Sequence, residues 1–168
     1  MRLHSRRTMI ALSYIIEEHA AEAGRETVLI ASFQRLSLYA HQLERYRRIA
    51  SRCATVYVLA WPDVLVPAIP GVVIIPLDAS WPMVQEWDVI AYGPQISAGL
   101  FAQDRVGFSP EQCSSSFEGL FTDDSIQIER AVGQLAAALG LPTRTVTPDR
   151  AAIRSATASI RRTLVSRG

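Results

Sequence analysis

The first sixty residues alternate between the hydrophobic period of a helix and that of a buried strand. Over Ser5–Ala23, apolar residues recur every three or four positions, which predicts a helix with one apolar face. Ser5 is placed to cap its start and Gly24 to end it. Residues 27–33 then form a short apolar run without polar alternation, which indicates a strand covered on both faces. We therefore expect a layered α/β fold.

The alternation continues through the rest of the chain. A helix is predicted over Gln34–Ser51, and a strand–helix–strand order implies a parallel pair with a right-handed crossover. The last strands follow one another too closely for long crossovers, so part of the sheet is antiparallel. We expect one α/β domain with a mixed, partly parallel sheet of five or six strands. Further strands are predicted at 55–60, 72–77, 88–92, 96–103 and 117–121, and a capped helix at Asp124–Leu139.

Charge divides the chain into a body and two basic ends. Residues 5–141 form the predicted domain, and residues 142–168 a basic C-terminal tail or helix with six arginines and one acid. Residues 1–8 carry three arginines and no acid, whereas residues 9–141 have a net charge of −7. Such ends can bind nucleic acid, fold back onto the acidic body or remain solvated. Direct binding of nucleic acid is not favoured, because no aromatic residue interleaves the arginines.

Composition excludes several classes of protein. All seventeen basic residues are arginine, so neither a P-loop nor a Schiff-base cofactor can be built. Apolar runs are too short to cross a membrane. Two cysteines cannot form a disulfide framework, which indicates a cytoplasmic protein. The chain lacks the common catalytic motifs and a metal-ligand spacing of histidines, and we expect no catalysis.

A candidate ligand site lies at the predicted strand ends, where α/β folds build pockets. The three tryptophans Trp61, Trp81 and Trp87, with Tyr92, suit either an aromatic cavity for a flat ligand or a second hydrophobic cluster. Phe33 and Gln34 end the first apolar strand. The Gln34 amide suits a ligand contact, a helix cap or a tie between two loops. Asp63 suits a ligand contact or a solvated turn.

Four residues, Cys113, Asp104, Asp63 and His19, carry alternative interpretations. A small cytosolic enzyme would use Cys113, Asp104 or Asp63 as its reacting group. Cys113, in a predicted mobile loop, suits a reactive or bilin-attaching thiol better than Cys53, although an ordinary loop cysteine is the simpler interpretation. His19 lies on the apolar helical face, which is typical of a hydrogen-bonded buried histidine and leaves haem ligation open.

Several segments together resemble one known family. SRRTMIALSYIIEEHA, VLIASFQ and LERYRRIA are similar to the opening of the DICT sensory domain, which is named for its association with diguanylate cyclases and two-component systems. EWDVIAYGP, ISAGLFAQDR and FEGLFTDDSIQIERAVGQL resemble its later half. The resemblance covers roughly Ser5 to Leu139, and the opening is most similar to copies attached to MerR-type regulators.

This resemblance implies a non-enzymatic sensory module with a proposed link to light or redox signalling. Its expected partners are a small-molecule ligand or chromophore and a signalling protein or transcription regulator. The chain contains no DNA-binding or cyclase domain, which leaves its direct output open. The first helix and the C-terminal segment are the expected dimer or partner surfaces, and a homodimer is predicted. The sequence predicts no particular cofactor.

Overall fold

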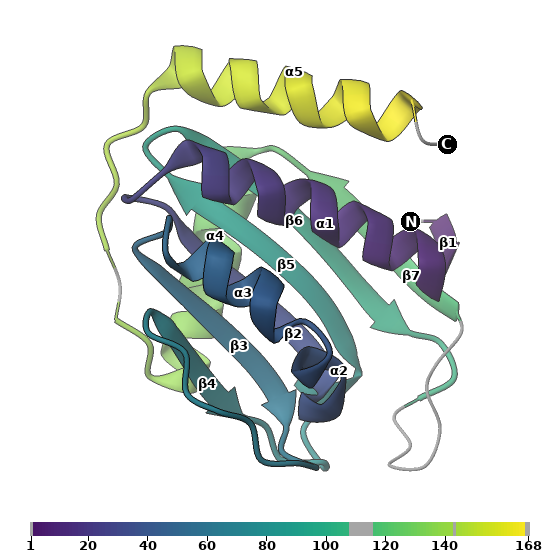
Figure 1. The fold of residues 1–168 in the computed structure, drawn as a ribbon. Coiled ribbons are helices and arrows are strands. Elements are labelled where there is room, and N and C mark those ends of the chain that lie inside the picture. The colour runs from purple at the N-terminus through teal and green to yellow at the C-terminus, as the bar shows by residue number, and fades with distance from the viewer. Residues whose placement is uncertain (1, 108–115, 143, 167–168) are drawn as a thin grey trace.

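A computed structural model describes residues 2–107, 116–142 and 144–166, and these form one seven-stranded sheet covered by helices (Figure 1). The strands are β1 (Arg2–Ser5), β2 (Val28–Arg35), β3 (Thr55–Trp61), β4 (Val72–Pro76), β5 (Glu86–Gly93), β6 (Ile96–Asp104) and β7 (Ser116–Thr122). The helices are α1 (Arg6–Ala23), α2 (Leu36–Ala40), α3 (Leu43–Ala50), the 3-10 turn η1 (Pro82–Gln85), α4 (Ser125–Leu139) and α5 (Arg150–Ser166).

The sheet has a parallel half and an antiparallel half. Its strand order is β1-β7-β6-β5-β2-β3-β4. β2, β3 and β4 run parallel, whereas β5, β6, β7 and β1 pair antiparallel, and β5 joins the two halves by pairing with β2. The predicted mixed, partly parallel sheet is confirmed. The predicted strand number was too low, because β1 precedes the first helix and lacks an apolar run that would reveal it.

Side-chain caps mark the starts of α1 and α4. Ser5 caps α1, since its hydroxyl accepts a hydrogen bond from the Thr8 backbone N–H at 3.2 Å. Asp124 caps α4 in the same way through Ile126 N–H. Gln127, three residues after this cap, accepts a hydrogen bond at its Oε1 from the Thr122 hydroxyl. Cap residues are therefore reliable in this chain where their oxygen reaches a free helix amide.

The predicted helix over Gln34–Ser51 is wrong in two respects. Gln34 still belongs to strand β2, and α2 starts at Leu36. The helix is then interrupted at Gln42, whose backbone leaves helical geometry with φ −121° and ψ 14°. Asp63 fixes this later start, because its carboxylate accepts hydrogen bonds from the Ser37 N–H at 2.9 Å and the Ser37 hydroxyl at 2.5 Å. A contact distant in sequence thus replaces the local helical pattern.

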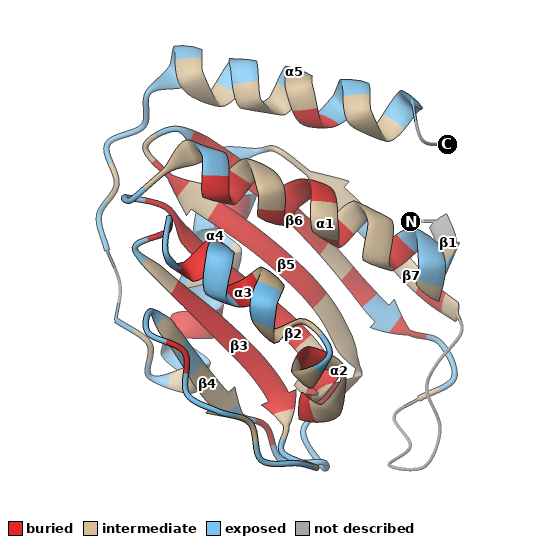
Figure 2. Cartoon of the chain, viewed as in Figure 1, coloured by how far each residue is buried: buried red, intermediate tan, exposed pale blue. Residues whose placement is uncertain are grey.

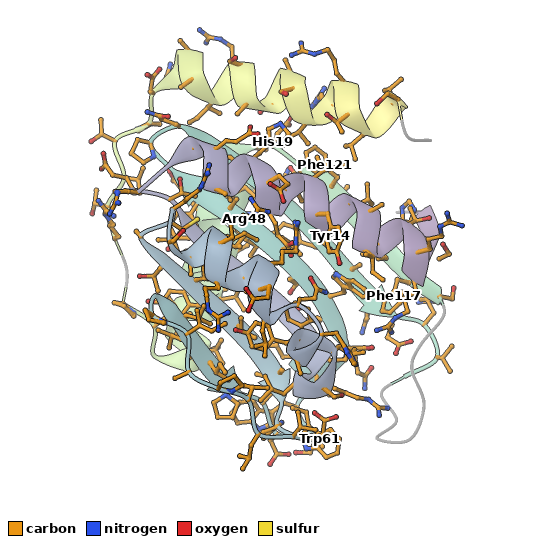
Figure 3. All side chains as sticks on the ribbon, in the orientation of Figure 1. Tyr14, His19, Arg48, Trp61, Phe117 and Phe121 are labelled. Atoms are coloured by element: carbon orange, nitrogen blue, oxygen red, sulfur yellow. The ribbon has the colours of Figure 1, made fainter. Side chains whose placement is uncertain are left out.

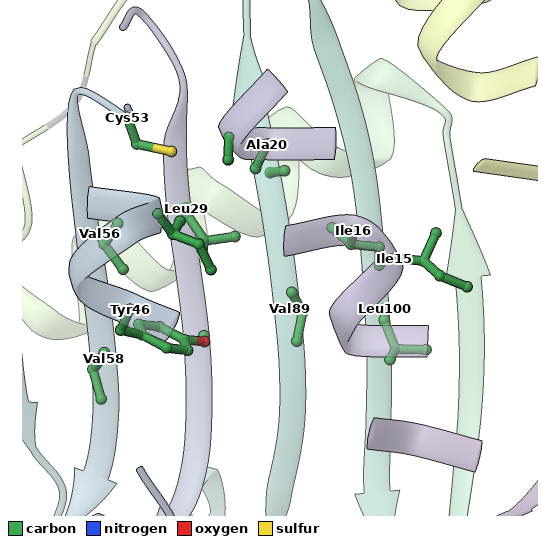
Figure 4. Close-up of a cluster of buried hydrophobic side chains, with 14 of the residues drawn as sticks. Ile15, Ile16, Ala20, Leu29, Tyr46, Cys53, Val56, Val58, Val89 and Leu100 are labelled. Atoms are coloured by element: carbon green, nitrogen blue, oxygen red, sulfur yellow. The ribbon is translucent and has the colours of Figure 1, made fainter. Parts of the chain in front are cut away.

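Most of the helices lie on one face of the sheet. α1, α2, α3 and α5 cover this face and α4 the other (Figure 1), and the central strands between them are the most buried elements (Figure 2). Ile16, Leu29 and Leu100 belong to the main core under α1 and α3 (Figure 4). On the α4 face, a Cβ at Gly99 would lie 2.6 Å from Ile128 Cδ1, so glycine permits the close approach of this helix.

The C-terminal segment folds back onto the body. α5 lies beside α1 (Figure 1), and Ser159 Oγ is 3.0 Å from His19 Nε2. Ile160 is the buried residue of α5, with 1% of its surface exposed. Arg161 pairs with Asp123 at 2.6 Å, and the segment leading to α5 adds an exposed pair between Arg144 and Glu26. Of the three alternatives for the basic C-terminal end, these contacts support folding back.

A buried carboxyl lies on β5, the strand that joins the two halves of the sheet. Asp88 on β5 borders a shallow groove together with Glu86 and Glu118. Burial raises the pKa of Asp88 well above its usual range, and the neighbouring charge of Glu86 raises it further. The folded protein therefore keeps the Asp88 proton to higher pH than the unfolded chain does. Stability must then fall as pH rises from the unfolded pKa of Asp88 through its folded pKa.

Replacing Asp88 with asparagine is expected to flatten this dependence. The amide has the shape of the protonated acid and carries no charge, so D88N should lose less stability than the wild type as pH rises from 4 to 8. Urea unfolding at several pH values measures the difference. The matched control is Glu129→Gln on the exposed side of α4, which should leave the profile unchanged. Parallel profiles for D88N and the wild type would contradict the assignment.

Candidate functional site

β2 and β5 stop pairing halfway along their length. Their ladder runs from Val28 opposite Tyr92 to Ala31 opposite Val89. At the next position the hydroxyl of Ser32 accepts a hydrogen bond from Asp88 N–H at 2.6 Å and lies 3.2 Å from the Glu86 carbonyl, to which it donates. A side chain thus takes the place of the backbone pair. Beyond it, β2 is no longer paired with β5, although it still pairs with β3 as far as Arg35.

A cavity of about 290 Å³ lies at this end of β2, between α1 and α2. Its volume is close to the lower limit of typical small-molecule pockets. Most of the lining is apolar or aromatic, and polar groups are few. The lining residues are Arg6, Ile10 and Tyr14 of α1, Ser32, Phe33 and Gln34 of β2, Leu38 of α2, His41 and Gln42 after it, and Trp87 of β5.

Trp87 forms a fixed wall of the cavity. Its Nε1–H donates a hydrogen bond to Ser13 Oγ at 2.9 Å, and its ring meets Phe117 edge-on with centroids 5.1 Å apart. The guanidinium of Arg6 lies over the indole at 5.5 Å from the ring centroid, within cation–π range. Three contacts therefore hold the indole in one orientation before any ligand arrives.

Phe33 connects the cavity to a buried aromatic cluster. Its ring packs edge-on against Tyr39 and Tyr46, each with centroids 5.6 Å away. Tyr46 in turn donates its hydroxyl hydrogen to Glu17 Oε1 at 2.8 Å. A displacement of Phe33 would therefore act on Tyr46 and, through its hydroxyl, on a carboxylate of α1.

That carboxylate belongs to an ion cluster that joins α1 to α3. Arg45 of α3 donates from Nε to Glu17 at 2.9 Å and from Nη1 to Glu18 at 2.6 Å. Its guanidinium also stacks on Tyr14, 4.0 Å from the ring centroid, and Tyr14 lines the cavity. Figure 3 labels Tyr14 on α1 and Arg48, which also pairs with Glu18. Burial raises the pKa of Glu17, while the charge of Arg45 and the Tyr46 hydroxyl oppose this rise.

Gln34 ties the two halves of the sheet together below the cavity. Its Nε2 donates to Asp104 Oδ2 at 3.0 Å, and both side chains are buried. Asp104 Oδ1 also accepts hydrogen bonds from the backbone N–H groups of Val106 and Gly107, at 2.8 and 3.2 Å. A tie between two loops was one prediction for Gln34, but the tie it makes joins two strands, β2 and β6, and the residue borders the cavity as well.

The structure brings together three of the seven predicted site residues. Phe33, Gln34 and Trp87 line the same cavity. The three tryptophans are not gathered around it, because Trp81 lies in a separate groove with Met83 and Leu139. The other predicted residues also lie elsewhere: Trp61 ends β3, at one end of the molecule (Figure 3), Asp63 holds Ser37, and Tyr92 packs with the second hydrophobic cluster beside α4.

Sequence reasoning missed the contribution of α1. Arg6, Ile10 and Tyr14 are spaced by four residues, so they share one helical face that a search for strand ends does not consider. Ser32 has no sequence signal, because its importance lies in replacing a backbone pair. Likewise, His41 and Gln42 enter the cavity only because the helix is interrupted there.

The other chemical candidates have structural partners or lie outside the described residues. Cys113 lies outside the described residues. Cys53 is described, and burial raises the pKa of its thiol to about 11. Both ring nitrogens of His19 are hydrogen-bonded, Nδ1 to the Ile15 carbonyl at 2.8 Å and Nε2 to Ser159. Within the described ranges, the histidines, cysteines and acids form no group of three that could hold a metal. No helix in that part of the chain is long and apolar enough to span a bilayer.

An α/β domain with an apolar cavity at a strand end, bordered by a few polar groups, has the usual form of a small-molecule-binding domain. A family model described as the sensory domain in diguanylate cyclases and two-component systems, DICT, matches residues 2–105, more than half of the chain. No curated protein and no solved structure matches the chain at a significant level. The chain belongs to the DICT family, and its role is sensory signal transduction.

Proposed function

We propose that this DICT domain is a non-catalytic cytoplasmic receptor that binds a small ligand or chromophore in the cavity at the end of β2. The observation that supports this proposal best is the cavity itself, which has a prepared aromatic wall and borders the ends of β2 and α2. The carboxylates suggested as reacting groups have structural hydrogen bonds, which supports the proposal: Asp63 bonds Ser37 of α2, and Asp104 bonds Gln34 and the backbone after β6.

The proposed output passes through α1. One side of this helix lines the cavity through Ile10 and Tyr14, and further along it His19 bonds Ser159 of α5. A ligand that prefers one position of α1 therefore also favours one position of α5. The proposed recipient is a signalling protein or transcription regulator that contacts these two helices, and the proposed working unit is a homodimer. In this proposal the stimulus is a metabolite or, with a bound chromophore, light or redox state.

Filling the cavity is expected to abolish ligand binding. Leu38 lines it, and Leu38→Trp adds an indole in the space that a ligand would occupy. A library of small aromatic acids, amides and heterocycles can be titrated into the labelled wild-type protein. Binders are expected to shift the NMR signals of the Trp87 indole N–H and the Phe33 amide. In L38W these shifts should disappear.

The matched control is Leu65→Trp, the same substitution at a fully exposed leucine in the loop after β3. It should bind every fragment as the wild type does. Fragments that bind the wild type and L38W equally, or that shift only signals near Trp81, would contradict the assignment of the site.

A further inference from the structure

The wall of the cavity contains a buried oxygen without a hydrogen-bond partner. Gln42 lines the cavity, and its Oε1 is buried and accepts no hydrogen bond from the residues that the structure describes. Buried polar atoms in folded proteins are normally hydrogen-bonded, because a buried acceptor that has lost water and found no donor destabilises the protein. A ligand that fills the cavity therefore either donates to this oxygen or leaves it unpaired.

Three other polar groups of the lining already have partners. The hydroxyl of Ser32 both accepts and donates a hydrogen bond within the sheet. The Trp87 side-chain N–H donates to Ser13, and Gln34 Nε2 donates across the sheet to β6. These groups stabilise the fold around the cavity, whereas the oxygen of Gln42 makes no such contact within the described part of the chain.

The fold does not use the side chain of Gln42 as a helix cap. Gln42 is the N-cap residue of α3, where serine or aspartate would accept a hydrogen bond from a free helix amide, but its side chain makes no cap. Its backbone supplies the contacts at the break between α2 and α3. The Gln42 N–H donates to the Tyr39 carbonyl at 2.7 Å, and its carbonyl accepts from the Tyr46 N–H at 2.9 Å.

The position of Gln42 limits the size of the donor. A second pocket of about 10 Å³ shares six lining residues with the cavity, Gln42 among them. This recess has room for no more than one water-sized group. A donor that reaches Gln42 from the cavity is therefore small, such as an N–H or O–H carried directly on a ring.

The remainder of the lining selects the shape of the ligand. Tyr14, Phe33 and Trp87 supply aromatic surfaces, and a volume of about 290 Å³ suits one or two fused rings better than a long or branched molecule. We propose that the cavity binds a flat aromatic molecule whose N–H or O–H group donates a hydrogen bond to Gln42 Oε1. This inference rests on the proposed function, since it specifies the ligand of the same site.

Indole and benzofuran test the donor, because they have nearly the same shape and only indole carries an N–H. NMR titration of the whole labelled chain, followed through the Trp87 side-chain N–H and the Phe33 amide, should give a Kd about tenfold lower for indole. Benzofuran would leave the glutamine oxygen buried and unpaired. Gln42→Met removes the acceptor and keeps the length of the side chain. In Q42M the two Kd values should agree within about twofold, and benzofuran should bind at least as tightly as it does to the wild type.

Gln134→Met is the matched control, since Gln134 is exposed on α4, on the other face of the sheet (Figure 1). Q134M should keep the tenfold preference for indole. Urea unfolding provides a second readout: Q42M should be no less stable than the wild type, because it removes a buried acceptor that lacks a partner. A clear loss of stability in Q42M would mean that the side chain stabilises the fold, contrary to the inference.

Equal Kd values of the wild type for indole and benzofuran, or the same ratio in Q42M as in the wild type, would overturn the donor inference and leave the cavity as the ligand site. If neither these probes nor any library fragment shifts the cavity signals, the inference and the proposed function both fail.

Discussion

Replacing Arg45 with methionine is expected to lower the free energy of unfolding by about 3 kcal/mol, the typical cost of breaking a buried ion pair from one side. Glu17 is 2% exposed and accepts from both Arg45 and Tyr46. Without Arg45, its carboxylate stays buried with the tyrosine hydroxyl as its remaining partner. Urea unfolding near pH 7.5 measures the loss. The loss should shrink as pH is lowered, because a protonated Glu17 needs no cation.

Two controls separate this effect from the loss of a surface charge. Arg47→Met, in the same helix, removes an exposed pair with Glu44 and should cost no more than about 0.5 kcal/mol. The double variant with Glu17→Gln and Arg45→Met should recover most of the stability, because no unpaired charge remains buried. Equal losses for R45M and R47M would mean that the cluster does not join α1 to α3 as described.

Truncating Ile160 to alanine is expected to release α5 from the body. A fully buried isoleucine contributes about 2–4 kcal/mol through its packing, and Ile160 is the buried residue of this helix. Because α5 lies at the surface, its release is expected to be local, so the loss of global stability is limited to the docking energy. Hydrogen exchange should show rapid exchange in α5 and near-normal protection of the central strands.

Val165→Ala provides the comparison, since Val165 lies on the same helix with 83% of its surface exposed. It should leave the exchange of α5 unchanged. Normal protection of α5 in I160A would show that the ion pair at Arg161 and the hydrogen bond at Ser159 suffice to hold the helix. Uniform loss of protection throughout the sheet would instead make α5 an inseparable part of the core.

Sequence patterns were most informative where burial and local capping agree. The apolar run at residues 27–33 identified a strand because both of its faces are buried, and the period of α1 identified a helix because one of its faces is buried. Prediction failed where a distant contact decides the local structure. The Ser37–Asp63 hydrogen bonds start α2, and β1 pairs with β7, which is more than one hundred residues away. Neither pairing leaves a signal within a short window of sequence.

The cavity was only partly predictable for the same reason. Phe33, Gln34 and Trp87 lie at strand ends, where α/β folds expose side chains, and a rule based on position finds them. The space itself exists because Ser32 ends the β2–β5 ladder, an event set by three-dimensional register. Aromatic composition alone grouped Trp81 with Trp87, yet the sheet separates their surroundings.

The short β2–β5 ladder has a mechanical consequence. It contains four residue pairs, against seven between β2 and β3 and eight between β5 and β6. The two halves of the sheet are therefore joined by fewer backbone pairs than hold each half together. We expect any small rotation of one half relative to the other to occur about the β2–β5 ladder. Such a rotation would change the width of the cavity. At the same time it would lengthen the Gln34–Asp104 hydrogen bond and displace Arg45 relative to Glu17. Ligand binding in the cavity would thereby change the angle between the two halves of the sheet. Helix α1 packs on the antiparallel half and is joined to α3 by the Arg45 cluster, so it would transmit this change toward its C-terminal end.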